Sequence, residues 1–226
     1  MNQRRPLCSR LILPVILLLF IVTLHAGVLL WTFEGIFFSA SFYGREFSKP
    51  SMLQDMTPAE AMGRTTGLLG YYAGKEPLDT TGFDEREVTH LQDVAGVVRQ
   101  GISLKWALTI LFLATAPIAF IVAGAKPLRA LLVSYVVLLI LLLVLWLAPF
   151  DALFGKFHEA LFPAGTYTFD PATSLLKQTY PDQLFEDFLK ELAIRLALVH
   201  AAVVAVASVA LLSITRRQQS SRPYAT

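Results

Sequence analysis

Four long hydrophobic runs without a charged residue divide the chain. The runs are Leu11–Phe33, Trp106–Ala125, Ala130–Phe150 and Leu196–Thr215. Each has at least 20 residues, and about 20 apolar residues suffice for a helix to cross the hydrocarbon core of a bilayer. Backbone groups must be hydrogen-bonded inside lipid, so the runs predict helices rather than open strands. We expect transmembrane helices at about 11–33, 104–125, 128–149 and 193–215.

The first polar stretch, 34–103, predicts two further helices. Thr57-Pro58-Ala59-Glu60 is typical of a capping box with proline at the first helical position. This helix should run to about residue 73 and stop at Gly74. Asp84 and Glu87 have the same spacing as Thr57 and Glu60, with a capping residue followed three positions later by glutamate. They predict a second helix that carries His90 and leads toward the second hydrophobic run.

The second polar stretch, 150–192, predicts a short strand followed by helix. The segment 165–169 has the composition of a short strand, and Asp170-Pro171 suits an N-cap followed by a helix start. Phe185, Phe188, Leu189 and Leu192 then follow helical spacing into the fourth run. The segment 126–129, between the second and third runs, is too short to hold a site.

Composition and charge place this pattern in a membrane. Hydrophobic residues make up 55% of the chain, charged residues only 16%, and the mean hydropathy is +0.57. Segments 1–10, 126–129 and 216–226 hold eight Lys/Arg and no acidic residue, whereas all 17 acidic residues lie in the two polar stretches. The basic segments should be cytoplasmic, with both termini inside. The net charge of +2 averages two oppositely charged faces, and no basic patch suggests nucleic acid.

The predicted fold class is an α-helical membrane protein. Four transmembrane helices should carry a small mixed, mainly helical extracytoplasmic cap, at 34–103 and 150–192, within one membrane domain of 1–226. The basic start of the first run resembles a signal peptide, but no small-x-small cleavage site closes it, so we expect a retained helix. The single cysteine, Cys8, excludes an intramolecular disulfide.

Candidate chemistry lies in the polar stretches, beginning with His90. Glu87, His90 and Asp93 are three residues apart, so they should lie along one face of their helix. A carboxylate beside a histidine can fix its tautomer and raise its pKa, which suits a base working near neutral pH. The alternative interpretation is a solvated polar face.

A second block surrounds His158. Phe157-His158-Glu159 places two titratable groups among aromatic residues, and Tyr167, Phe169 and Asp170 follow. Thirteen of the 16 phenylalanines lie in the polar stretches or at their edges, which indicates either the walls of a lipid-chain pocket or an interfacial aromatic belt. In the second interpretation Asp170 is only an N-cap.

The sequence gives little support for phosphate-binding, serine-nucleophile or metal chemistry. Glycine-rich phosphate loops, Gly-x-Ser-x-Gly elbows and paired-cysteine metal spacings are absent from the sequence. Glu87, His90, His158 and Glu159 could in principle hold zinc, but adjacent residues such as His158 and Glu159 point in different directions, so we expect no metal. His25 and His200 lie within hydrophobic runs and should bond across helices rather than act in catalysis.

The two blocks together resemble the lipoprotein intramolecular transacylase family of bacterial integral membrane proteins. The resemblance covers nearly the whole chain. It departs from the usual pattern at Tyr167, where tryptophan is usual, and at Ser174, where an acidic residue is usual. The residues that carry it are Phe83, Glu87, His90-Leu91, Asp93-Val94, Asp151, Phe154, Phe157-His158-Glu159, Phe162, Tyr167, Phe169-Asp170-Pro171, Leu175-Leu176, Tyr180-Pro181 and Phe185.

The resemblance implies an acyltransferase in the bacterial cell membrane with His90 and His158 as catalytic residues. Its implied supporting residues are Glu87, Asp93, Glu159, Tyr167, Phe169 and Asp170. The implied substrate is a diacylglyceryl-modified lipoprotein among membrane lipids, whose sn-2 acyl chain moves to its own N-terminal cysteine amine, with no cofactor. Two alternatives remain: a membrane-surface lipid ester hydrolase that uses the same histidines, and a non-catalytic scaffold. Direct joint action requires the two imidazoles to lie within about 10 Å, given hydrogen-bond reach.

Overall fold

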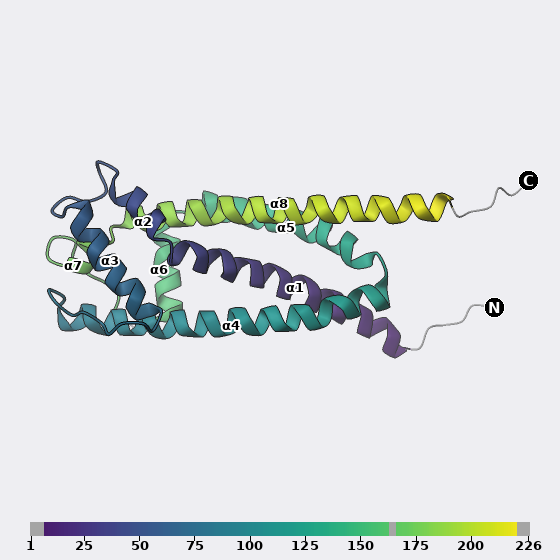
Figure 1. Ribbon diagram of the computed structural model, residues 1–226, viewed down its shortest axis with the longest axis horizontal. Helices are drawn as coiled ribbons and strands as arrows, with labels where there is room; N and C mark the ends of the chain where they lie inside the picture. Colours follow the sequence, from purple (N-terminus) through teal and green to yellow (C-terminus); the bar gives the residue numbers. More distant parts are fainter. Residues whose placement is uncertain (1–6, 163–165, 221–226) are drawn as a thin grey trace, which may run out of the picture. The chain divides into compact units, whose positions relative to one another are not determined.

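The computed structural model describes residues 7–162 and 166–220, and all regular secondary structure in these ranges is helical (Figure 1). The helices are α1 Leu7–Phe37, α2 Ala40–Phe47, α3 Pro58–Tyr72, α4 Glu85–Ala123, α5 Lys126–Leu147, α6 Phe150–Leu161, α7 Leu175–Thr179 and α8 Asp182–Ser220.

Four of these helices are long and apolar enough to span a membrane, as the hydrophobic runs predicted. The candidate spans are Ile12–Phe37, Glu85–Ala123, Lys126–Leu147 and Asp182–Arg216. Many of their aliphatic side chains are exposed, including Ile121, Val133 and Val206. Such large apolar surfaces are not tolerated in water but are natural against lipid tails. The chain is therefore a multi-pass membrane protein.

The chain forms two compact units. The membrane unit comprises Met1–Trp31, Lys105–Trp146 and Ile194–Thr226, and the cap unit comprises Thr32–Leu104 and Leu147–Ala193. Helices α1, α4 and α8 contribute residues to both units, because each is longer than the roughly 20 residues that a span requires.

A small core holds the four helices of the membrane unit together. It consists of Phe20 from α1, Ala119 from α4, Leu128 and Leu131 from α5, and Ala207 from α8. Alanine at such contacts lets helix backbones approach closely, which supplies the packing energy that lipid cannot. The link between α4 and α5 turns at Gly124, whose φ of +59° suits a residue without a side chain.

The cap unit begins its helices with the predicted caps. Thr57 and Glu60 form the reciprocal capping box of α3, and Gly74, with φ +70°, follows the end of that helix. Helix α4 starts in the same way. The Asp84 carboxylate accepts the Glu87 N–H at 2.8 Å, and the Glu87 carboxylate accepts the Asp84 N–H at 2.9 Å.

The buried contact between α3 and α4 fixes the turn of α4 that carries His90. Leu68 and Tyr72 of α3 pack with Leu91 and Ala95 of α4, and all four side chains are buried. Leu91 follows His90 directly, so packing on one side of the helix sets the orientation of the other side.

The prediction of a mixed cap was wrong for the described residues, which contain helices but no strand. Residues 166–169 of the predicted strand are irregular, and Gly165 lies outside the described residues. The predicted helix start at Asp170 was also wrong. Asp170 instead closes a turn through its side chain, which accepts the Ala172 N–H at 2.9 Å. Helix α7 begins at Leu175, with Ser174 as its N-cap.

Candidate active site

The two predicted catalytic histidines lie together in the cap unit. His90 is in the second turn of α4 and His158 is near the end of α6. Their rings are stacked with centroids 6.1 Å apart and planes inclined by 25°. This separation is inside the limit of about 10 Å for direct joint action, so both imidazoles can reach one substrate group without a domain movement.

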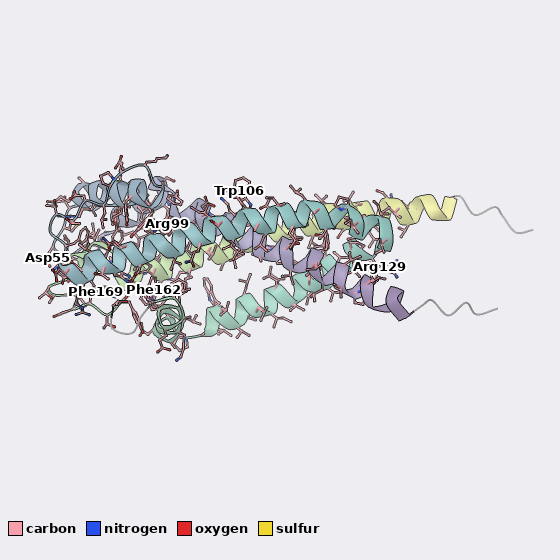
Figure 2. The ribbon with its side chains drawn as sticks, turned by 90° about the horizontal axis from the view of Figure 1, so that it is seen from below. Asp55, Arg99, Trp106, Arg129, Phe162 and Phe169 are labelled. Carbon is pink, nitrogen blue, oxygen red and sulfur yellow. The ribbon has the colours of Figure 1, made fainter. Side chains whose placement is uncertain are left out.

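Aromatic side chains enclose both histidines. Phe162 contacts the two rings, with centroids 4.9 Å from His90 and 5.4 Å from His158. Phe169 lies 5.6 Å from His90, and Tyr167 lies 5.3 Å from His158. Phe162 and Phe169 are labelled in Figure 2. Because of this enclosure His90 is only 7% exposed and His158 only 8%.

The tautomer of His158 is fixed by its own helix. Its Nδ1 lies 2.8 Å from the carbonyl oxygen of Phe154, one turn earlier on α6. A carbonyl can only accept, so Nδ1 carries the proton and Nε2 of the neutral ring presents a lone pair. Burial lowers the pKa of His158 below its usual value, although the hydrogen bond to Phe154 partly opposes this effect. The ring is therefore a neutral base at pH 7.

His90 has an unsatisfied polar atom in the same place. Its Nδ1 is buried and has no hydrogen-bond partner among the described residues. Leaving a buried donor or acceptor unpaired costs about 1–3 kcal/mol, so an atom of this kind calls for a functional explanation. A hydrogen-bonding group of a bound substrate would satisfy it.

Glu87 has partners other than His90. Its carboxylate accepts hydrogen bonds from the Ser174 hydroxyl and from the Leu176 N–H, the second at 2.8 Å, in addition to the Asp84 N–H. Glu87 is only 2% exposed, so these bonds are shielded from water. The carboxylate ties the start of α4 to the start of α7, and this fixes the helix that carries His90.

Replacing Glu87 with alanine should therefore destabilise the fold. The change leaves two backbone N–H groups and a hydroxyl without their charged acceptor, and bonds of this type contribute about 1.5–3 kcal/mol each. We expect a loss of at least about 3 kcal/mol, seen as a lower unfolding temperature of the detergent-solubilised protein. Glu85→Ala is the matched control, because Glu85 is an exposed carboxylate in the same helical turn. Equal shifts in both variants would contradict this role.

The other predicted supporting residues divide into two groups. Tyr167 and Phe169 lie against the histidines, as described above. Glu159 instead pairs with Lys156 at 2.6 Å in an exposed position, and Asp170 closes its local turn. Asp93 is half-buried one turn after His90 but does not bond the unsatisfied Nδ1.

Several residues of the site were not predicted as functional. Phe154 supplies the carbonyl that orients His158, and Phe162 touches both imidazoles. Arg86 donates to the Thr168 carbonyl at 3.0 Å and its guanidinium lies 5.7 Å from the Phe169 ring. The spacing of Phe150, Phe154 and His158 follows one helical face, so the Phe154 contact could have been found had α6 been predicted.

The described ranges, 7–162 and 166–220, contain no group of three His, Cys, Asp or Glu side chains arranged to hold a metal ion. His25 and His200 bond each other across helices in the membrane unit, with Nδ1 of His25 lying 2.8 Å from Nε2 of His200. They belong to the membrane unit, whereas His90 and His158 belong to the cap unit.

Comparison with known proteins places this arrangement in a family. The family model described as lipoprotein intramolecular transacylase Lit matches residues 12–185, a range that contains both His90 and His158. No curated protein sequence matches the chain.

Solved structures of the membrane integral lipoprotein intramolecular transacylase Lit from Bacillus cereus have the same fold. One superposes with a TM-score of 0.72 at 14% identity, covering 93% of this chain and 99% of that chain. Two variants, in which a histidine is replaced by alanine or by arginine, give TM-scores of 0.75 and 0.74 at 15% identity. They cover 91% and 93% of this chain and 96% and 95% of theirs. The chain belongs to the lipoprotein intramolecular transacylase family.

Proposed function

We propose that this acyltransferase moves the sn-2 acyl chain of a diacylglyceryl-modified lipoprotein to the amine of that lipoprotein's N-terminal cysteine. The observation that carries the proposal is the enclosed pair of histidines, in which His158 has a fixed basic Nε2 and His90 a buried unsatisfied nitrogen. The product is an N-acylated lyso-form lipoprotein. The family name supports a lipoprotein substrate.

The proposed reaction uses the free-amine form of the N-terminal cysteine. An α-amino group has a pKa of about 7.7–8.0 and is partly protonated at neutral pH. In the free amine, nitrogen attacks the ester carbonyl while Nε2 of His158 takes the proton that the nitrogen loses. A bond forms between nitrogen and the carbonyl carbon, and the carbonyl oxygen becomes an oxyanion.

Collapse of this intermediate completes the transfer. The bond between the carbonyl carbon and the sn-2 oxygen breaks, and the leaving alkoxide takes the proton back from His158. An N–H of His90 donates to the oxyanion in our proposal, which would satisfy the ring that the protein leaves unpaired. Amine and ester belong to one substrate molecule, so holding them together supplies much of the remaining acceleration.

The aromatic enclosure favours transfer over hydrolysis. Both histidines are more than nine-tenths buried, and Phe154, Phe162, Tyr167 and Phe169 contact their rings. A site that excludes water protects an acyl group from the competing nucleophile. Mass spectrometry of lipoproteins from cells that express the chain tests the proposal directly. N-acylated lyso forms are expected, whereas released fatty acid with a free amine would show a hydrolase and unchanged lipoproteins a scaffold.

We further propose that the cap unit is extracytoplasmic and that both termini are cytoplasmic, in a bacterial inner membrane. The supporting observation is the charge distribution: segments 1–10, 126–129 and 216–226 hold eight Lys/Arg and no acidic residue, whereas all 17 acidic residues lie in the stretches 34–103 and 150–192. This side would give the site access to lipoproteins that have crossed the membrane.

The activity should fall with decreasing pH in two separate steps. Protonation of the substrate amine lowers log kcat/KM with a slope of one below about pH 7.7–8.0. Burial lowers the pKa of His158, so its protonation should add a second unit of slope only below its usual value near 6.5. A pH–rate profile of the reconstituted enzyme measures both steps. A slope of two that already begins at or above pH 6.5 would contradict a buried neutral base.

A further inference from the structure

The membrane unit contains an open groove, and none of the residues that line it belongs to the cap unit. It has a volume of about 640 Å³ and runs between α1 and α5, within the range of about 300–1,000 Å³ typical of ligand pockets. Its lining residues are Ile21, His25, Arg129, Ala130, Val133, Ser134, Val137, Leu138 and Leu141.

The long wall of the groove is a single stripe along α5. The lining positions from Ala130 to Leu141 recur every three or four residues, as one helical face requires. From Arg129 to Leu141 the stripe extends about 18 Å along the helix axis. One leaflet contributes about 15 Å, half of the hydrocarbon core, so the groove matches the depth of one lipid chain.

The polar groups in the floor of the groove are already satisfied. Ser134 lies 2.9 Å from Nε2 of His25, whose Nδ1 lies 2.8 Å from His200. Nδ1 of His200, which is 2% exposed, lies 2.8 Å from the Leu196 carbonyl. The chain of bonds joins α1, α5 and α8. It also leaves an apolar surface for the occupant, which excludes a polar ligand and fits an acyl chain.

Arg129 gives the groove a charged end. Its side chain is exposed and makes no ion pair within residues 7–162 and 166–220. No acidic residue occurs in the sequence between Asp93 and Asp151, so α5 offers it no counter-charge. A cation at one end of an apolar stripe one leaflet long complements a phosphate followed by an acyl chain.

We infer that this groove is a binding site for an anionic glycerophospholipid, with its phosphate at Arg129 and one acyl chain along Val133, Val137 and Leu141. The site is independent of the proposed acyl transfer. Its ligand comes from the leaflet on the side of the link between α4 and α5.

Photocrosslinking of the full chain tests this site. The protein is reconstituted in phosphatidylcholine vesicles that contain a trace of phosphatidylglycerol with a photoreactive acyl chain, and adducts are located by peptide mass spectrometry. We expect adducts concentrated on residues 130–141. Val137→Trp should fill the groove and remove most of them. Arg129→Gln should reduce them about fivefold, the equivalent of about 1 kcal/mol for one basic residue at a membrane surface.

Matched variants separate the groove from general lipid contact. Val136→Trp adds the same bulk at an exposed position of α5 that does not line the groove, and Arg216→Gln removes an exposed charge elsewhere. Both should label like the unmodified chain, and helical content by circular dichroism should be unchanged in all four variants. Adducts spread evenly over the four spans, or equal labelling of Val137→Trp and Val136→Trp, would overturn the site. Equal labelling by photoreactive phosphatidylcholine would overturn its preference for anionic lipid.

Discussion

Replacing His158 with alanine should lower acyl transfer by about 10²–10⁴-fold, the usual contribution of a positioned general base. The fixed Nδ1–H to the Phe154 carbonyl leaves Nε2 as the basic atom of this ring. Lyso-form lipoprotein, measured by mass spectrometry against the amount of enzyme in the membrane, gives the loss. His158→Gln should be equally inactive, because an amide can donate and accept but cannot take a proton at neutral pH.

The adjacent carboxylate supplies the control. Glu159 is exposed and pairs with Lys156, so Glu159→Gln should retain activity within about twofold, as expected for a surface pair of little energetic weight. Full activity in both His158→Ala and Glu159→Gln would exclude His158 as the base. A loss in both variants of equal size would indicate damage to α6 rather than removal of a catalytic group.

The membrane architecture could be predicted from the sequence because the requirements for a transmembrane helix are local. A span needs only length and low charge, so the candidate spans could be recognised from composition. Capping boxes are also local, and the pair Thr57 and Glu60 begins α3 as expected. The caps of α4 formed from Asp84 and Glu87 for the same reason.

The role of Glu87 could not be predicted in the same way. Spacing on the helix placed it beside His90, but its carboxylate bonds to Ser174 and Leu176, almost 90 positions later. A buried carboxylate must be hydrogen-bonded, and its donors can come from any part of the fold. The sequence pattern within α4 therefore does not reveal donors at the start of α7. Asp170 differs from Glu87, because its carboxylate accepts the Ala172 N–H within a local turn and no helix begins there.

The pairing of His90 with His158 could not be predicted from helical spacing alone. Helical spacing alone favoured a solvated face for His90, whereas the structure buries both rings among aromatic side chains. Phe154 and Phe162 complete this enclosure from α6 and from the residue that follows it. The resemblance to a family drew attention to the two histidines, and their geometry supports the proposed roles of base and oxyanion donor.

Replacing His90 with alanine should lower acyl transfer by about 10²–10³-fold, the typical cost of removing one oxyanion donor. The prediction that separates the two histidines is partial rescue by glutamine at position 90. Its amide N–H can replace a hydrogen bond to the oxyanion, so His90→Gln should exceed His90→Ala by at least about tenfold.

Substitution of the neighbouring Gln92 with alanine should leave the rate unchanged, because that side chain is exposed whereas the His90 ring is buried. The rates are compared by lyso-form lipoprotein produced per enzyme in reconstituted vesicles. If glutamine rescues His158 and fails at His90, the assignment of base and oxyanion donor must be reversed. Rescue at neither position would instead indicate that both imidazoles transfer protons, because glutamine preserves hydrogen bonding but not proton exchange at neutral pH.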